Sequence, residues 1–182
     1  MTEGEIIQGC LNKNTAAQHA LFRNYAGVLM TICRRYSGDH AEAEDMLQEA
    51  FIRIFKFINQ YQGTGSFEGW IKRITVRSCL QILQARKVRF SELSESHQEI
   101  QISLPDTISD LDADEILKQV SYLPVGYRMI FNLYVIEGYS HEEIGQMLKI
   151  KTATSRSQLS KARSMLQVKI NSQQKISCEY DR

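Results

Sequence analysis

Hydrogen-bonding and cationic side chains recur along residues 152–163 at the spacing of a helix face. Thr154, Ser157 and Lys161 share this face, and it is flanked by Arg156, Gln158 and Arg163. Hydroxyl, amide, ammonium and guanidinium groups suit base edges and phosphates. No Asp or Glu occurs in residues 144–178, so the field there has one sign and attracts a polyanion. The pattern predicts a DNA-contacting face; the alternative is the solvated face of an ordinary helical bundle.

The residues around this face predict a helix-turn-helix. Gly138 can take the left-handed conformation that closes a preceding helix, and Ser140 with Glu143 can form a capping box at the start of a short helix. The chain breaks at residues 149–151, and a second helix is expected to open near Thr152. Such a unit lays its second helix in a DNA major groove. Ser140 and Thr152, at the two helix starts, are therefore counted among the predicted DNA-binding residues.

The overall charge of the chain conceals a strong segregation along the sequence. The 182 residues suit one domain or two small ones, and the net charge is only +1. The amino-terminal residues are acidic rather than basic, which argues against a signal peptide. The longest uncharged apolar run, between Arg23 and Arg34, is too short to span a bilayer. We expect a cytoplasmic protein with no membrane insertion.

The cysteines and histidines predict neither a metal site nor a disulfide. The four cysteines lie far apart in the sequence, and the four histidines do not complete a metal-binding set. Cys33 and Cys79 share helix faces with apolar neighbours, which favours small buried thiols. No nucleophile-base pair or phosphate loop is evident, so we expect no cofactor and no enzymatic activity.

The third of the expected helices, near residues 41–60, has two distinct faces. It follows helices expected at residues 3–11 and 15–36, and its buried stripe includes Leu47, Phe51 and Ile54. The opposite side presents Asp45, Gln48, Glu49 and Ile52. An aliphatic side chain among carboxylates and an amide predicts a partner-docking surface, although single exposed apolar residues are also normal.

A glycine-rich loop and a basic helix come next. The loop, residues 61–66, is not followed by the Lys-Ser/Thr of a phosphate-binding loop. The helix is expected from residue 67 to about 87, and every charge between Gly69 and Ser91 is positive. Aromatic residues beside such a run resemble the stacking and phosphate contacts used for single-stranded nucleic acid. Considered by itself, Trp70 is predicted to be a core residue rather than a platform on which a base stacks.

The sign of the charge then reverses. Residues 91–117 contain no Lys or Arg and many carboxylates, a composition that predicts a linker. We expect an all-α protein with a four-helix domain at residues 1–90, an acidic flexible linker at 91–112, and a helix-turn-helix domain at 113–170. A polar tail, residues 171–182, is expected to fray after about Gln167.

This order of domains and its local strings resemble the extracytoplasmic-function group of bacterial RNA polymerase sigma factors, in the sigma-70 family. The strings are AEDMLQEAF at residues 43–51, FEGWIKRI at 67–74, LPVGYR at 123–128 and EGYSHEEI at 137–144. The string SRSQLSKAR at residues 155–163 is similar to the Bacteroidetes members. Each string is weak alone, and their shared order makes the likeness specific.

The resemblance implies a transcription initiation factor that binds core RNA polymerase and promoter DNA. It implies that the first domain binds the beta-prime clamp helices through Asp45, Gln48, Glu49 and Ile52, that the second domain reads the minus-thirty-five element, and that the beta flap is a further polymerase contact. An anti-sigma factor is a further partner that it allows. The residues it implies for the minus-ten element are Tyr61, Ser66, Trp70, Lys72, Arg73, Arg77 and Gln81.

The sequence departs from the family pattern at several positions. Arg77 stands where the family usually carries Asn, Gln81 where an acidic or amide residue is common, and Gln84 where Arg is frequent. Two other functions remain open at this point: a stand-alone helix-turn-helix regulator that binds duplex DNA without polymerase, and a helical scaffold without DNA contact. A stand-alone regulator would give the amino-terminal domain no function. The basic segments that lack Asp and Glu argue against a scaffold without DNA contact.

Overall fold

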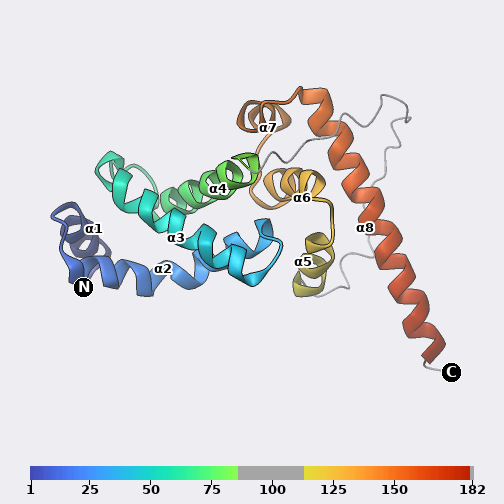
Figure 1. The fold of residues 1–182 in the computed structure, drawn as a ribbon, viewed down its shortest axis with the longest axis horizontal. Helices are drawn as coiled ribbons and strands as arrows, with labels where there is room; N and C mark the ends of the chain where they lie inside the picture. The colour runs from blue at the N-terminus through green and yellow to red at the C-terminus, as the bar shows by residue number, and fades with distance from the viewer. Residues whose placement is uncertain (86–112, 181–182) are drawn as a thin grey trace. The chain divides into compact units, whose positions relative to one another are not determined.

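Helices account for every regular element in the part of the chain that the structure describes (Figure 1). The computed structural model describes residues 1–85 and 113–180, with side chains described for residues 1–85 and 117–169. The predicted all-α class is thereby confirmed. The chain divides into two compact units, Met1–Arg86 and Lys87–Arg182. The predicted linker at residues 91–112 lies outside the described residues.

The first unit contains α1 (Glu3–Leu11), α2 (Thr15–Tyr36), α3 (His40–Phe57), the short 3-10 helix η1 (Ile58–Gln60) and α4 (Phe67–Ala85). Three of these helices begin at polar caps, because the side chains of Thr2, Asn14 and Asp39 each accept a hydrogen bond from a backbone N–H of the first turn. Such caps satisfy donors that the helix itself leaves unpaired.

The core of the first unit lies where α2, α3 and α4 pack on one another. Each helix contributes an apolar stripe at helical spacing, and Leu29, Ile54 and Ile71 are among its fully buried side chains. Burial of one such side chain contributes roughly 1.5–3 kcal/mol. The predicted stripe of α3 is confirmed, since Leu47 and Phe51 are buried beside Ile54.

The second unit contains α5 (Ala113–Ser121), α6 (Val125–Phe131), the π-helical turn η3 (Asn132–Ile136), α7 (His141–Leu148) and α8 (Thr152–Tyr180). α6 and α7 pack against α8, and Ile144, Leu159 and Leu166 are buried between these helices (Figure 1). The helix expected over residues 125–136 is α-helical as far as Phe131 and π-helical from Asn132.

The prediction of a fraying tail is wrong about where the last helix ends. The helix was expected to fray after about Gln167, whereas α8 continues to Tyr180. No Gly or Pro occurs after Thr152, and these are the residues that most often end a helix. A polar composition by itself removes the packing face of a helix but not its backbone hydrogen bonds.

Candidate nucleic-acid and protein interfaces

The outer face of α3 presents the residues that the sequence singled out for docking. Asp45, Gln48 and Ile52 are exposed and Glu49 is half-buried. Ile52 is 61% exposed, which is high for an aliphatic side chain on a helix that packs on two others. The face therefore offers one apolar contact surrounded by hydrogen-bonding groups, and we call these four residues the docking face.

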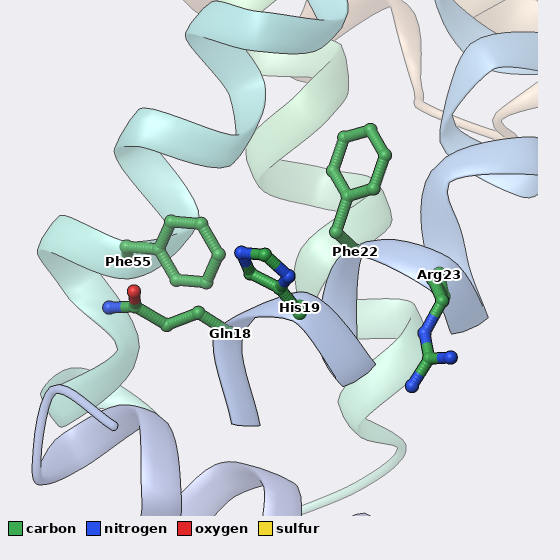
Figure 2. Close-up of a pocket in the computed structure, with 5 residues that line it drawn as sticks. All are labelled: Gln18, His19, Phe22, Arg23 and Phe55. Atoms are coloured by element: carbon green, nitrogen blue, oxygen red, sulfur yellow. The ribbon is translucent and has the colours of Figure 1, made fainter. Parts of the chain in front are cut away.

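A shallow pocket lies one helical turn beyond Ile52, where α3 meets α2. Its volume is about 330 Å³, and it is lined by Gln18, His19, Phe22 and Arg23 of α2 and Phe55 of α3. Figure 2 shows Phe55, Gln18 and His19 around the hollow, with Arg23 directed away from it. The exposed Phe22 ring also packs on buried Phe51, with 4.7 Å between ring centroids. An aromatic surface formed by Phe55 and Phe22 thus begins one helical turn beyond Ile52 and reaches α2.

Arg53 joins the docking face to α4. Its Nε donates to Glu49 Oε1 at 2.6 Å, and a second guanidinium nitrogen donates to Gln81 Oε1 on α4. Sequence reasoning missed Arg53. The four-residue spacing from Glu49 could have indicated the first contact, whereas the second spans 28 residues and depends on how α3 and α4 pack.

The outer face of α4 carries an exposed line of residues spaced four apart: Arg73, Arg77 and Gln81. Lys72, also predicted to read DNA, instead pairs with Glu68 at 2.6 Å along the same helix. The cations most accessible to a polyanion on this helix are therefore Arg73 and Arg77. We call Arg73, Arg77 and Gln81 the α4 face.

An aromatic cluster holds the loop before α4. The rings of Tyr61, Phe67 and Trp70 lie with centroids 5.1 to 5.8 Å apart, and Tyr61 Oη donates to the Gly65 carbonyl at 2.7 Å. Ser66 Oγ accepts from the backbone N–H of Gly69 at 3.3 Å. Trp70 and Tyr61 are half-buried, so each ring combines a packing contact with some accessible surface. Five of the predicted minus-ten residues thus have structural contacts of their own: Tyr61, Ser66, Trp70, Lys72 and, through Arg53, Gln81.

The helix-turn-helix forms as predicted. Ser140 and Glu143 make the capping box, with Glu143 N–H donating to Ser140 Oγ at 3.2 Å and Ser140 N–H donating to Glu143 Oε2 at 2.8 Å. These bonds hold the pKa of the Glu143 carboxyl below its usual value, the backbone N–H of Ser140 contributing most. Gly138 has a positive φ, as expected.

The turn between α7 and α8 depends on close backbone contact. Lys149 takes the left-handed conformation, with φ 56°, and ends α7. A Cβ at Gly145 would lie 2.9 Å from the Ile150 carbonyl oxygen, closer than side chains normally pack. A glycine at this position therefore lets the turn fold back tightly on α7.

Exposure divides the predicted DNA-binding residues of α8 into two sets. Arg156 and Ser157 are exposed, while Thr152, Thr154, Lys161 and Arg163 are half-buried. The placement of Gln158 on this accessible face is wrong, because its side chain is 6% exposed and packs inward beside Leu159. Its Oε1 has no hydrogen-bond partner within the described residues. Helical spacing put Gln158 at the edge of the polar face, and packing against α6 and α7 placed that edge inside.

Polar and aromatic contacts join α7 and η3 to α8. His141 Nδ1 hydrogen-bonds the buried Ser155 Oγ at 2.9 Å, and its ring stacks on Tyr134 with 4.3 Å between centroids. Burial lowers the pKa of His141, and the nearby Arg156 guanidinium lowers it further. Arg163 lies 6.0 Å from the Tyr134 ring centroid. Sequence reasoning missed Tyr134 and His141, since their contacts form only after the helices pack.

Arg156 forms an ion pair with Glu142 across the turn. Its Nη2 lies 3.6 Å from Glu142 Oε1, and both side chains are 64% exposed. A pair this exposed contributes little to stability. Arg156 can therefore exchange Glu142 for a phosphate at small cost.

Comparisons with known proteins match both units. The family model for sigma-70 region 2 matches residues 21–89, and the model for sigma-70 region 4 matches residues 113–166. The ECF RNA polymerase sigma factor SigE of Mycolicibacterium smegmatis is 36% identical over 152 residues, which cover 80% of this chain and 58% of that protein. The chain thus spans less than two thirds of this relative's length.

The similarity to two other proteins extends over most of the chain. The ECF RNA polymerase sigma-E factor of Escherichia coli K12 is 25% identical over 184 residues, covering 93% of this chain and 95% of that protein. A solved structure of the sigma factor RpoE from Bartonella quintana, in complex with the anti-sigma factor NepR, has a TM-score of 0.50 at 20% identity. It covers 82% of this chain and 96% of that chain.

The chain belongs to the sigma-70 family, and the Mycolicibacterium smegmatis and Escherichia coli relatives that it resembles are extracytoplasmic-function sigma factors. Members of this family are promoter-specificity factors of RNA polymerase and not enzymes, so family membership confirms the predicted function class. None of the helices in the described residues is long and apolar enough to cross a membrane. The same residues contain no group of three or more His, Cys, Asp or Glu side chains that could hold a metal ion.

Proposed function

We propose that this sigma factor binds core RNA polymerase through the docking face and brings promoter DNA to the α4 face and to α8. The observation that carries the proposal is the exposure of Ile52, one helical turn after Gln48 and two after Asp45, on a helix whose opposite side is buried. An apolar centre with a polar rim is the usual arrangement of a protein interface. The aromatic surface at Phe22 and Phe55 can extend the contact.

The two DNA-reading surfaces differ in chemistry. Arg73, Arg77 and Gln81 are proposed to contact the minus-ten element, with Tyr61 and Trp70 offering aromatic surface for an unstacked base. The helix-turn-helix is proposed to read the minus-thirty-five element, with Arg156 on phosphate and Lys161 at base edges. Thr154 and Ser157 are proposed to add hydrogen bonds from the same side of α8.

Several finer points are proposals on the same footing. The first domain is proposed to span residues 1–90 and the linker residues 91–112, with the second domain beginning at residue 113. The protein is proposed to act in the cytoplasm, where polymerase and chromosome are found, and to be Bacteroidetes-like on the basis of residues 155–163. An anti-sigma factor is a proposed partner, since the Bartonella protein was crystallised with one, and the beta flap is a proposed contact of the second domain.

The docking proposal is tested by measuring binding to core polymerase. Replacing Gln48 and Ile52 together by Ala is expected to weaken core binding by about 2–4 kcal/mol, the range for central interface residues, with unchanged helicity. Val28→Ala is the matched control, because Val28 is also an exposed aliphatic side chain but lies on α2. Equal core affinity of the double variant and the wild type would remove the docking face from the polymerase contact.

A further inference from the structure

Two cysteines that lie far apart in the sequence meet between α2 and α4. Cys33 and Cys79 are separated by 46 residues, yet their sulfur atoms are 4.0 Å apart, with the Cys79 thiol donating to Cys33 Sγ. Both side chains are fully buried, as predicted, and both are thiols. The sequence spacing led us to expect no disulfide.

The two thiols are not chemically equivalent. The hydrogen bond from Cys79 lowers the pKa of the Cys33 thiol, against an opposing effect of burial. Burial alone raises the pKa of Cys10, which lies in α1. Since the thiolate is the nucleophile, and Cys33 Sγ accepts the hydrogen bond that Cys79 donates, we assign the attack to Cys33.

We propose that Cys33 and Cys79 form a dithiol site that a hydroperoxide oxidises to a disulfide. The Cys33 thiolate attacks the peroxide, so an S–O bond forms as the O–O bond breaks, and the leaving oxygen departs as an alcohol or water. Cys79, as its thiolate, then attacks the sulfenic sulfur of Cys33. The S–S bond forms, the S–O bond breaks, and the displaced hydroxide leaves as water with the proton from Cys79. The two thiols lose two electrons in total, and the peroxide gains them.

The geometry favours this product over other oxidation states. A disulfide bond is about 2.05 Å long, so the two sulfurs must approach by about 2 Å, which requires side-chain rotation with a small helix movement. Once Cys33 is a sulfenic acid, its neighbour Cys79 is the nearby thiol that can trap it before further oxidation. Complete burial makes the first step slow and excludes bulky thiols from the pair.

The bond would covalently join α2 to the helix that carries Arg73, Arg77 and Gln81. Disulfides inside cells are mostly transient and redox-sensing, and a pair of thiols in contact within a reducing interior fits that use. The dithiol site depends only on the positions of the two sulfur atoms and not on what the α4 face binds.

The test is a peptide map of the full chain after exposure to hydrogen peroxide. The oxidised protein is unfolded in guanidinium, remaining thiols are alkylated, and a tryptic digest is analysed by mass spectrometry. We expect residues 24–34 and 78–86 to appear as one disulfide-linked peptide, and the thiol count to fall from four to about two. Circular dichroism before unfolding checks that the oxidised chain is still helical.

The variants separate this pair from general oxidation. Cys10→Ala and Cys178→Ala should keep the linked peptide, and Cys33→Ala or Cys79→Ala should lose it. Dimedone should label Cys33 several-fold more in the Cys79→Ser variant, whose hydroxyl can still donate a hydrogen bond to Cys33 Sγ, than in the Cys79→Ala variant, which lacks the donor. The proposal is overturned if the oxidised chain remains helical and its map shows Cys33 and Cys79 alkylated, oxidised to sulfinic acids or paired with other cysteines. The map of the wild-type chain decides this even if a variant does not fold.

Discussion

At the residue scale, exposure separates side chains that can reach DNA from those that share its chemistry but hold the fold. Arg156 and Gln158 are two residues apart on α8, and both have groups that bases and phosphates accept. Arg156 is exposed and bound only loosely to Glu142, whereas Gln158 is buried. The same reasoning on α4 favours Arg73 and Arg77 over Lys72, which already pairs with Glu68.

Arg156 and Lys161 are expected to give different binding signatures. Arg156→Ala should weaken binding to all DNA sequences about equally and lower the salt slope by about one, because it removes a phosphate contact. Lys161→Ala should cost roughly 1–3 kcal/mol at a cognate minus-thirty-five element and less elsewhere. Anisotropy with polymerase holoenzyme on matched and scrambled elements measures both effects.

Gln158→Met is the matched control for this experiment, because it keeps the size of a buried side chain and removes its polar atoms. It should leave the minus-thirty-five preference unchanged. A loss of preference in this variant would return Gln158 to the DNA-reading residues, and a uniform effect of Lys161→Ala would contradict its assignment to base edges.

Arg53 is expected to matter for promoter opening because it holds Gln81 in place from α3. Arg53→Ala should slow opening about fivefold, equivalent to about 1 kcal/mol for a half-exposed charged hydrogen bond. Permanganate reactivity of unpaired thymines over time measures the rate. Lys56→Ala is the control, since Lys56 is an exposed cation of α3 that lies over its neighbour Phe57. Equal slowing by both variants would mean that general charge, and not the bridge, is responsible.

At the element scale, the helix-turn-helix is held by local bonds at its start and by close packing at its turn. The capping box of Ser140 and Glu143 fixes where α7 begins. The Ile150 N–H donates to the Gly145 carbonyl at 3.0 Å, and the absence of a Cβ at Gly145 leaves room for the Ile150 carbonyl, so the chain returns closely on α7. Both features act before any DNA is bound, so they position α8 in advance.

The cap predicts a local stability effect with a defined pH dependence. Ser140→Ala should destabilise α7 by about 1 kcal/mol. The pKa of Glu143 is lowered from 4.5 in the folded chain. Its stabilising effect is therefore complete above the unfolded carboxyl pKa and is lost as pH falls through the lower folded value. Hydrogen exchange of the α7 amides, measured from pH 7 down to the acid range, follows this change.

Glu143→Gln serves as the comparison, because it keeps a side chain that can reach the Ser140 backbone N–H but does not titrate. Its α7 amides should show a smaller pH dependence in the acid range than those of the wild type. Identical acid profiles for the two proteins would exclude Glu143 as the titrating group.

At the scale of the whole molecule, the DNA-reading surface proposed for each unit is small. The α4 face has two exposed arginines, and the accessible part of α8 is one short helix face. A single module of this kind makes few contacts and binds weakly at physiological salt. Two weak sites brought together by a common partner gain affinity through linkage.

The free chain is therefore expected to bind a cognate promoter weakly, and core polymerase should raise the apparent affinity by at least about 100-fold. Anisotropy at fixed salt, with and without core enzyme, measures the gain, and permanganate reactivity reports opening. Tight, sequence-specific binding by the free chain with no effect of polymerase would support a stand-alone regulator instead. Weak binding that polymerase does not improve would leave the helical scaffold as the remaining alternative.

The sequence by itself determined the features that depend on neighbours three or four residues apart. The capping box at Ser140, the positive φ of Gly138 and the buried stripe of Leu47, Phe51 and Ile54 all follow from helical periodicity and local backbone chemistry. The exposure of Ile52 follows from the same periodicity. The order and spacing of the local strings carried the resemblance to the family, which the family models confirm.

Only the tertiary structure decided which distant residues meet and which side of a polar helix faces inward. The contact of Arg53 with Gln81 spans 28 residues, and that of Cys33 with Cys79 spans 46. Gln158 is buried on α8, a helix that packs against α6 and α7. Periodicity gives the direction of a side chain around its own helix axis, but the contacts it makes depend on the crossing of that helix with others, which local sequence does not encode.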